Sequence, residues 1–343
     1  MNKKSKNLLP GKISGPILDS LLNKINISDP RIKVGAEIGE DAALIDIGDK
    51  FLVVTTDPIT FASDLLGWYL VNINANDIAV TGAKPKWLLT TLLFPSNTNT
   101  KTISDIFDDI VDACKKINVS IIGGHTEITD SISKPIAIGT MLGEVKKEKA
   151  VLTSGAKPGD RIIMTKGLGI EGTAILCRDR SKILVDSGVS NTTINKGGNY
   201  LFEPGISIIK DATTILNTAT INSMHDLTEG GLSTGILELA TASKVGAVIN
   251  NDDLIISPIT LECCMATSIN PLGLLSSGAL VATLSPTDVD KVIHALSKEN
   301  IICKNIGYVT EHTSEILLKS SKGTVELPKF DRDELARCFD MFN

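Results

Sequence analysis

The segment 71–80, with the sequence VNINANDIAV, breaks an ordinary rule of helix composition. It lies inside residues 64–82, where the spacing of apolar residues predicts a helix. Three asparagines and one aspartate stand within six residues of it. Such residues disfavour helix interiors because their side chains compete for backbone hydrogen bonds. Since local violations of this kind are expected at functional sites, we predict that Asn72, Asn76 and Asp77 belong to one. The alternative is an exposed polar face.

Short β-branched runs and longer periodic segments alternate on both sides of this helix. Strands are predicted at 42–47, 51–56, 119–122, 136–145 and 160–165, and helices at 13–25, 104–117, from about 171, and at 288–299. A strand-turn-helix unit is predicted at 221–242 and a loop at 186–199. This order indicates an α/β (α+β) protein. A charge run followed by Gly, Pro and Ser at 146–159 suggests two domains, residues 1–153 and 154–343.

The composition argues against a nucleic-acid-binding, disulfide-rich or membrane-spanning protein. The 343 residues are 42% hydrophobic and 22% charged, enough for two ordinary cores. With 34 basic and 40 acidic residues, the net charge of −6 provides no broad positive surface for nucleic acid. The six cysteines form no CxxC pair and are expected to be reduced thiols. No apolar run is long enough for a membrane span or a signal sequence. We expect a cytoplasmic protein that acts on a small molecule.

Four acidic residues stand in or beside predicted elements of the N-terminal half. Asp41 precedes an apolar strand, Asp57 ends the next one, where Pro58 is expected to stop the ladder, Asp77 lies in the helix, and Glu127 follows a glycine pair. Solvated turns are the ordinary alternative for isolated acids. Together, however, such carboxylates suggest Mg²⁺, which is usually held by one or two carboxylates and substrate phosphates.

Glycines mark three further segments. Residues 123–127 (GGHTE) follow a predicted strand, and paired glycines let a backbone approach a phosphate, although they also make turns. Asp226 and Glu229 have the spacing of a capping box at a helix start, which is equally an anion site. Residues 167–172 match GxGxxG, with Asp186 at a suitable distance, so a dinucleotide site is an alternative.

Seven segments together resemble one family. They are GEDAALID, VVTTDPIT, NANDIAVTGAKPKW, IIGGHTEIT, SGAKPGDRIIMTKGLGIEGTA, MHDLTEGGL and SGALVA, in this order across nearly the whole chain. The set resembles the AIR synthase-related (PurM-like) superfamily, and within it the HypE-like branch of hydrogenase-maturation proteins.

The resemblance implies a fold and a set of ligands. The N-terminal α/β domain would pair with a second copy to form a β-barrel, with a C-terminal α/β domain beside it and ATP and Mg²⁺ near the dimer interface. The implied metal ligands are Asp41, Asp57 and Asp77. The implied nucleotide site contains these three and Asn76, Gly123, Gly124, Thr126 and Glu127. Lys12, in an N-terminal segment that closes over nucleotide, and His125 would contact the transferring phosphate.

The implied activity is ATP-dependent phosphoryl transfer to a carbamoyl or amide-type oxygen, with a hydrogenase-maturation protein as a partner. In HypE the carbamoyl group is carried by a C-terminal cysteine, whereas here Cys338 lies five residues before the end. The alternatives are another synthetase or kinase of the superfamily, a nucleotide-binding module without turnover, and, from a different class, an NAD-binding oxidoreductase. Under the family resemblance, residues 167–172 are only a strand-to-helix turn.

Overall fold

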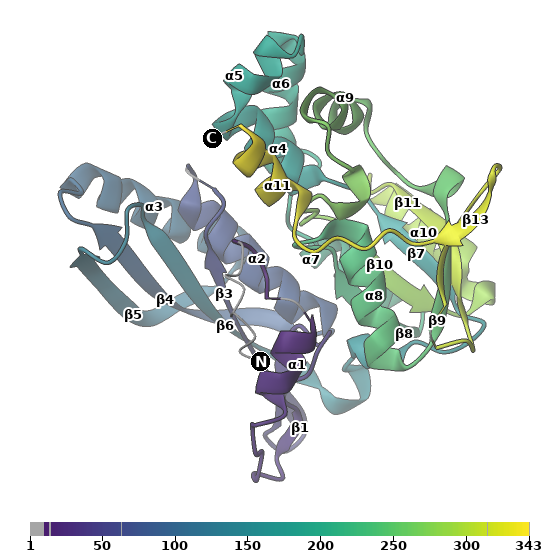
Figure 1. Cartoon of the computed structure of the whole chain (residues 1–343). Coiled ribbons are helices and arrows are strands. Elements are labelled where there is room, and N and C mark those ends of the chain that lie inside the picture. The colour runs from purple at the N-terminus through teal and green to yellow at the C-terminus, as the bar shows by residue number, and fades with distance from the viewer. Residues whose placement is uncertain (1–9, 14, 63, 314, 343) are drawn as a thin grey trace, which may run out of the picture.

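Two β-sheets from successive parts of the chain lie side by side in the computed structural model, which describes residues 10–342 except 14, 63 and 314 (Figure 1). The first sheet has the order β1-β2-β3-β6-β4-β5. Its strands are β1 (Ile32–Val34), β2 (Ala43–Asp46), β3 (Lys50–Ile59), β4 (Lys84–Pro95), β5 (Ser120–Thr129) and β6 (Ile136–Lys146). Helices α2 (Leu66–Val80) and α3 (Thr100–Ile117) belong to this half, preceded by α1 (Gly15–Leu22).

The second sheet has the order β13-β12-β9-β11-β7-β10-β8. Its strands are β7 (Arg161–Thr165), β8 (Ile221–Asp226), β9 (Gly246–Asn250), β10 (Leu280–Leu284), β11 (Cys303–Thr310), β12 (Ile316–Ser320) and β13 (Gly323–Glu326). The helices of this half are α4 (Ile170–Asp179), α5 (Ser181–Asp186), α6 (Asn191–Gly198), α7 (Ile209–Thr218), α8 (Gly231–Ser243), α9 (Pro258–Thr267), α10 (Val289–Lys298) and α11 (Glu334–Met341). The predicted two-part α/β architecture is confirmed, and the predicted boundary after residue 153 falls between β6 and β7.

Helices α2 and α3 are similar in length but differ in how much of their surface is buried. Helix α3 buries only one stripe, begins at Asn99, whose side chain accepts a hydrogen bond from the Thr102 amide, and ends at Asn118 in the left-handed conformation. Helix α2 is buried on nearly every side because it contacts β3 and β6 of the first sheet and α7 and β8 of the second half. An apolar cluster that includes residues of both halves continues around it.

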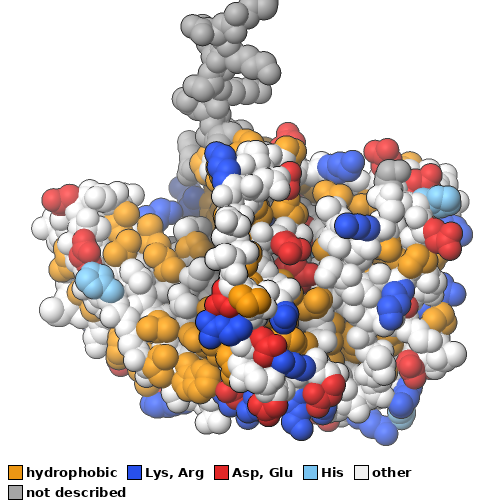
Figure 2. Space-filling view, turned by 90° about the horizontal axis from the view of Figure 1, so that it is seen from below, with side chains coloured by type: hydrophobic (Ala, Val, Ile, Leu, Met, Phe, Trp, Pro, Cys, Tyr) orange, Lys and Arg blue, Asp and Glu red, His pale blue; other side chains and the backbone are white. Residues whose placement is uncertain are grey.

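One face of the first sheet is open. Its buried residues alternate with half-buried apolar ones that point away from α2, among them Leu52, Val54, Leu89, Leu93, Ile138 and Leu142. Figure 2 is viewed from the side of this open face, and orange apolar side chains gather in the left part of the picture. Edge strand β5 is exposed over most of its length and carries Ile122 and Ile128, each more than half exposed.

The predicted loop at 186–199 is wrong, because residues Asn191–Gly198 form α6. The Ser190 side chain caps this helix by accepting a hydrogen bond from the Thr193 amide, and Ile194 is buried. Gly197 is required by packing: a Cβ there would lie 2.4 Å from the Cys177 Sγ. The glycines that suggested a loop therefore allow close helix packing.

The predicted end of the strand at Pro58 is also wrong, since β3 continues to Ile59 and Pro58 pairs with Ile138 of β6. Strand β2 pairs with β3 only as far as Val54, so β3 has an open edge beyond that point. A proline lacking an N–H is tolerated at such an edge.

Among the described residues, no helix combines the length and the apolar character that a membrane span requires.

Candidate functional site

Four aspartates from both halves of the molecule meet beside α2. Asp41 precedes β2, Asp57 lies on β3, Asp77 lies on α2 and Asp226 ends β8. Burial, followed by the charges of the other three, raises the pKa of Asp77 well above its ordinary value. Burial is also the main cause that raises the pKa of Asp57 to about 6 and that of Asp226 to about 8. Such mutual repulsion is costly unless a cation joins the acids.

The helix asparagines hold this site together. Asn74 Oδ1 accepts a hydrogen bond from the Asp57 amide at 3.0 Å, which ties β3 to α2. Asn76 Nδ2 donates to the Ile206 carbonyl at 2.8 Å, and its Oδ1 accepts from the Ile208 amide at 2.9 Å. The alternative of an exposed polar face is therefore wrong, because all three asparagines and Asp77 are buried. The predicted nucleotide contact of Asn76 stays a prediction, and its amide joins the two halves.

His225 positions Asp41. Its Nδ1 lies 2.8 Å from Asp41 Oδ2 and its Nε2 lies 3.2 Å from Glu238 Oε2, and the residue is 3% exposed. Although burial opposes it, the two carboxylates raise the pKa of His225 well above its ordinary value. Among the described residues, Asp41, His225 and Asp226 have potential ligand atoms within 4.8 Å of one another. Because both ring nitrogens are engaged, the carboxylates are the better metal ligands of this group.

The Asp226 carboxyl supports a cation at this place. The residue is 1% exposed, and its Oδ2 has no hydrogen-bond partner in the structure. Asp77 is partly satisfied by Thr55, whose hydroxyl donates to Asp77 Oδ2 at 2.7 Å. Unpartnered carboxylate oxygens in a closely spaced acidic set fit Mg²⁺, which prefers oxygen ligands.

Lys12 enters this acidic site from the N-terminal segment. Its backbone amide donates to Glu229 Oε1 at 2.6 Å, and its Nζ donates to Glu238 Oε1 at 2.7 Å. Burial opposes the lysine charge, but Glu238 and the neighbouring acids raise the pKa of Lys12. The structure therefore brings Lys12 close enough to two of the predicted acids, Asp41 and Asp57, for their charges to interact.

The predicted phosphate segment lies elsewhere. Gly123, Gly124, His125, Thr126 and Glu127 are part of β5, at the exposed edge of the first sheet. Gly124 pairs with Thr90 on β4, and Thr90 pairs across β6 with the position opposite Asp57 on β3. The backbones of Gly124 and Asp57 are therefore three strands apart, a distance of about 14 Å. His125 Nε2 lies 3.2 Å from Glu127 Oε2, and both side chains are exposed. Within one chain, these five residues are not joined to the acids.

The sequence placed Asp226 only in a capping box or an anion site, and Glu238 was not identified from the sequence. The capping-box interpretation of Asp226 and Glu229 is wrong, because β8 continues to Asp226 and α8 begins only at Gly231, after Gly230. A signal was present: the buried strand β8 ends in an aspartate, and Asp57 likewise lies near the end of β3. Glu238 stands seven residues into α8 and carries no signal in its neighbours.

The GxGxxG segment is a turn between β7 and α4. Gly169, in the left-handed conformation, starts α4, and a Cβ there would lie 2.9 Å from Thr260 Cγ2. Strand β7 pairs antiparallel with both β10 and β11. A dinucleotide fingerprint needs the parallel βαβ unit, so the NAD-binding alternative is wrong.

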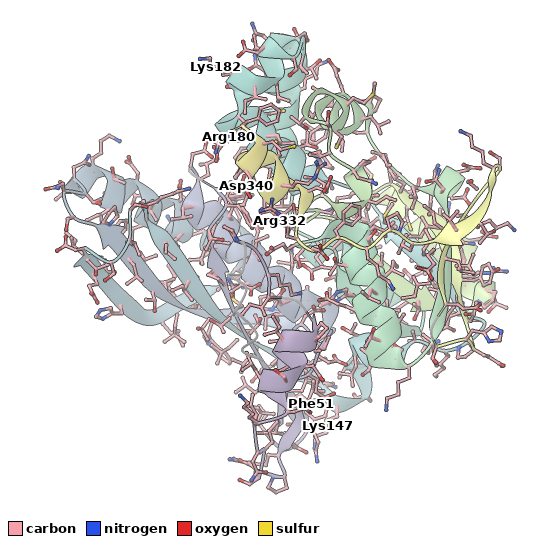
Figure 3. All side chains as sticks on the ribbon, in the orientation of Figure 1. Phe51, Lys147, Arg180, Lys182, Arg332 and Asp340 are labelled. Carbon is pink, nitrogen blue, oxygen red and sulfur yellow. The ribbon has the colours of Figure 1, made fainter. Side chains whose placement is uncertain are left out.

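Cys338 is buried in α11 and has no exposed surface. The same helix is held by an ion pair between Arg332 and Asp340 and by the Arg180 guanidinium, 4.4 Å from the ring of Phe339 (Figure 3). Burial raises the pKa of the Cys338 thiol. In this conformation Cys338 is not available as a carrier of a reacting group.

Comparison with protein families agrees with this arrangement. Residues 39–145 match the model for the AIR synthase related protein N-terminal domain, and residues 157–319 match that for its C-terminal domain. The chain belongs to the AIR synthase related protein family. The two matches together cover most of the chain, and one of them falls on each sheet.

Relatives within the AIR synthase related family carry several names. A putative hydrogenase expression/formation protein of Methanocaldococcus jannaschii is 29% identical, with 93% of this chain and 94% of the relative covered. The carbamoyl dehydratase HypE of Rhizobium leguminosarum bv. viciae is 24% identical, with 83% and 79% covered. A thiamine-monophosphate kinase of Buchnera aphidicola is 29% identical, with 80% and 84% covered.

Solved structures of the family have the same fold. The chain is similar to one in a HypE–HypF complex, with a TM-score of 0.72, 21% identity and coverage of 92% of this chain and 100% of that chain. It is also similar to hydrogenase maturation protein HypE in complex with ATP, with a TM-score of 0.68, 19% identity and coverage of 90% and 92%.

Proposed function

We propose that this protein is an ATP- and Mg²⁺-dependent enzyme that transfers a phosphoryl group to a carbamoyl or amide-type oxygen, as a HypE-like protein of hydrogenase maturation. One observation carries the proposal: aspartates from both halves converge on an acidic site in which a buried oxygen of Asp226 has no hydrogen-bond partner. The named relatives, including HypE determined with ATP, support the nucleotide and the reaction class.

The chain's own residues have distinct tasks in this proposal. Asp41, Asp57, Asp77 and Asp226 would hold Mg²⁺, which when bound neutralises the charge of the triphosphate. His225 keeps the Asp41 carboxylate in place through the contact between its Nδ1 and Asp41 Oδ2. Lys12 exchanges its partners Glu229 and Glu238 for a phosphate oxygen, which is the role of a cation in phosphoryl transfer.

The acceptor is assigned from the relatives. The carbamoyl dehydratase favours a carbamoyl group, and the hydrogenase expression/formation protein favours a role in hydrogenase maturation. The thiamine-monophosphate kinase makes a kinase of this superfamily the second candidate. Because Cys338 is buried, we propose that the carbamoyl group arrives on another molecule, and the HypE–HypF complex of a relative supports a maturation protein as the partner.

We also propose a homodimer built on the first sheet. Its support is the open apolar face of β3, β6 and β4 and the exposed edge strand β5, since a long apolar edge left unpaired invites aggregation. The residues Gly123–Glu127 would then face the second copy. Their predicted contacts with nucleotide stay a proposal that depends on this dimer.

Isothermal titration with ATP and Mg²⁺ tests the nucleotide site. We expect saturable binding that requires Mg²⁺ and that weakens at least tenfold in Asp77→Asn, because a buried charged ligand is lost. Asp112→Asn is the matched control, since Asp112 is an exposed acid of α3 that pairs with Lys115.

The absence of binding heat in the wild-type protein, or equal binding by Asp77→Asn, contradicts the site. ADP formation separates the enzyme from a module without turnover. Binding of ATP with no formation of ADP, in the presence of a carbamoyl compound or of thiamine monophosphate, would favour the module.

A further inference from the structure

A cavity of about 720 Å³ lies between the two halves of the molecule, away from the acidic site. Its walls are the end of α2, the turn into β4, the connection at 148–151 and one side of α7, which contacts α2. Ala79 lines the cavity and stands two residues after Asp77, about 200° further round the helix. Ile221 lines it at the start of β8, whereas Asp226 ends that strand about 16 Å away. The cavity and the acidic site are therefore separate places.

The interior of this cavity is apolar and is built largely from small side chains. Helix α7 contributes Ile209, Ala212 and Leu216, which are three or four residues apart and so share one face of the helix. Ala79 and Ala83 line it at and after the end of α2. An apolar space of roughly 300–1,000 Å³ is typical of pockets that hold a small molecule.

The chain that connects the two halves forms part of the wall. The Val151 amide donates a hydrogen bond to the Thr81 carbonyl at 3.0 Å. At Gly82 a Cβ atom would lie 2.6 Å from the Lys149 carbonyl oxygen, so the connection lies directly against the turn after α2. This wall is therefore held by backbone contacts of the protein itself, and a ligand in the cavity would touch both halves and their connection.

Two lysines give the opening of the cavity a positive charge. Lys84 begins β4, Lys149 lies in the connection, and both are exposed. Among the described residues neither of them forms an ion pair, whereas the nearby Lys86 pairs with Glu144. Glu148 is the only acid among the described residues that line the cavity. Two lysines and one glutamate leave an excess of positive charge, which favours an anion.

We infer that this cavity is a second ligand site, which binds an amphipathic anion. The alkyl or aryl body of the ligand lies among the apolar side chains of the interior, and its carboxylate or phosphate head group meets Lys84 and Lys149. Thr213 and Asn217, which line the cavity from the exposed side of α7, provide polar groups at its opening. The inference does not depend on the proposed function. Because such a ligand contacts both halves, its binding stabilises their present arrangement.

Calorimetric titration of the full chain with octyl phosphate and with octanoate, both below their micelle concentrations, tests the site. The buffer contains no Mg²⁺, so that the acidic site stays unfavourable to anions. We expect saturable binding of one molecule per chain, and the tighter of the two probes identifies the head group. Hexyl phosphate should bind at least fivefold more weakly than octyl phosphate, because each buried CH₂ group contributes about fourfold. Octanol, which has the same tail and no charge, should also bind at least fivefold more weakly.

Variants locate the bound anion. Lys84→Met and Lys149→Met should each weaken the binding of octyl phosphate at least fivefold, because a charge-assisted hydrogen bond is lost. Lys319→Met is the matched control, since Lys319 is an exposed lysine of β12 outside the cavity. Thr213→Trp should abolish binding by filling the cavity, and Thr324→Trp, at an exposed position of β13, is its control.

The inference is overturned if neither anion binds saturably, or if octanol binds as tightly as octyl phosphate. It is also overturned if the two lysine variants and Thr213→Trp bind octyl phosphate as the wild type does. Equal weakening by a control variant has the same consequence, since the anion then lies elsewhere on the surface.

Discussion

Glu171 illustrates what a buried carboxyl costs the folded protein. Burial is the main cause that raises its pKa from 4.5 to about 7, against the opposing effect of Ser277. A pKa that is higher in the folded than in the unfolded state means that the folded state binds more protons over this range. The stability provided by protonated Glu171 is therefore complete below pH 4.5 and is lost as the pH rises to about 7.

This shift makes a prediction for Glu171→Gln, whose side chain is neutral at every pH. One pKa unit corresponds to about 1.4 kcal/mol. Between pH 4.5 and pH 7 the wild type should therefore lose roughly 3 kcal/mol of its free energy of unfolding relative to the variant. Urea unfolding at several pH values, without nucleotide or Mg²⁺, measures this difference. Asp333 titrates nearby but is present in both proteins, so its contribution largely cancels. A constant difference across the range would contradict the prediction.

At the scale of the element, α2 shows which part of the site could be predicted. The density of asparagine and aspartate in residues 71–80 correctly indicated that this helix does not present an ordinary exposed polar face. The sequence could not separate the tasks of these residues, because the partners of Asn74 and Asn76 are backbone groups of β3 and of the segment before α7. A side chain that bonds a distant backbone leaves no pattern in its own neighbours. The glycines of α6 led to the wrong prediction of a loop, because they serve close packing against α4.

A buried ion pair fixes another element, α7. Lys166, just after β7, has its Nζ 3.2 Å from Asp211 Oδ2 in the first turn of α7, and it donates to the Ser207 carbonyl at 2.5 Å. The two side chains are 6% and 1% exposed. Burial, opposed by Asp211, lowers the pKa of Lys166. The pair therefore joins the end of a central strand to the start of a helix that contacts α2.

Removing the lysine charge from this pair should be costly. We expect Lys166→Met to lower the free energy of unfolding by about 3–5 kcal/mol, because an uncompensated carboxylate stays buried. Lys210→Met is the matched control: Lys210 is also paired, with Glu299, but at the surface, where such pairs contribute at most about 1 kcal/mol. Denaturant unfolding of the three proteins at pH 7 decides the matter, and equal losses for both variants would refute the assignment.

At the scale of the whole molecule, the division into two α/β halves could be predicted from the sequence, while the position of residues 123–127 could not. Strand and helix patterns describe what each segment becomes, but not which strand lies at an edge. Here β5 is the edge strand, three strands from Asp57, so its glycines and His125 are not joined to the acids of the same chain. A contact between copies would be set by surfaces that one sequence does not distinguish from other exposed residues.

The proposed dimer makes this last point testable. If the open face and the edge of the first sheet meet a second copy, a charge introduced on β5 should be buried there without a partner. We expect Ile128→Lys to raise the dissociation constant of the dimer at least tenfold, measured by sedimentation velocity over a range of concentrations. Ile302→Lys is the matched control, because Ile302 is 61% exposed, compared with 56% for Ile128, and lies in the second half. A wild-type monomer at all concentrations, or equal effects of the two variants, would reject this interface.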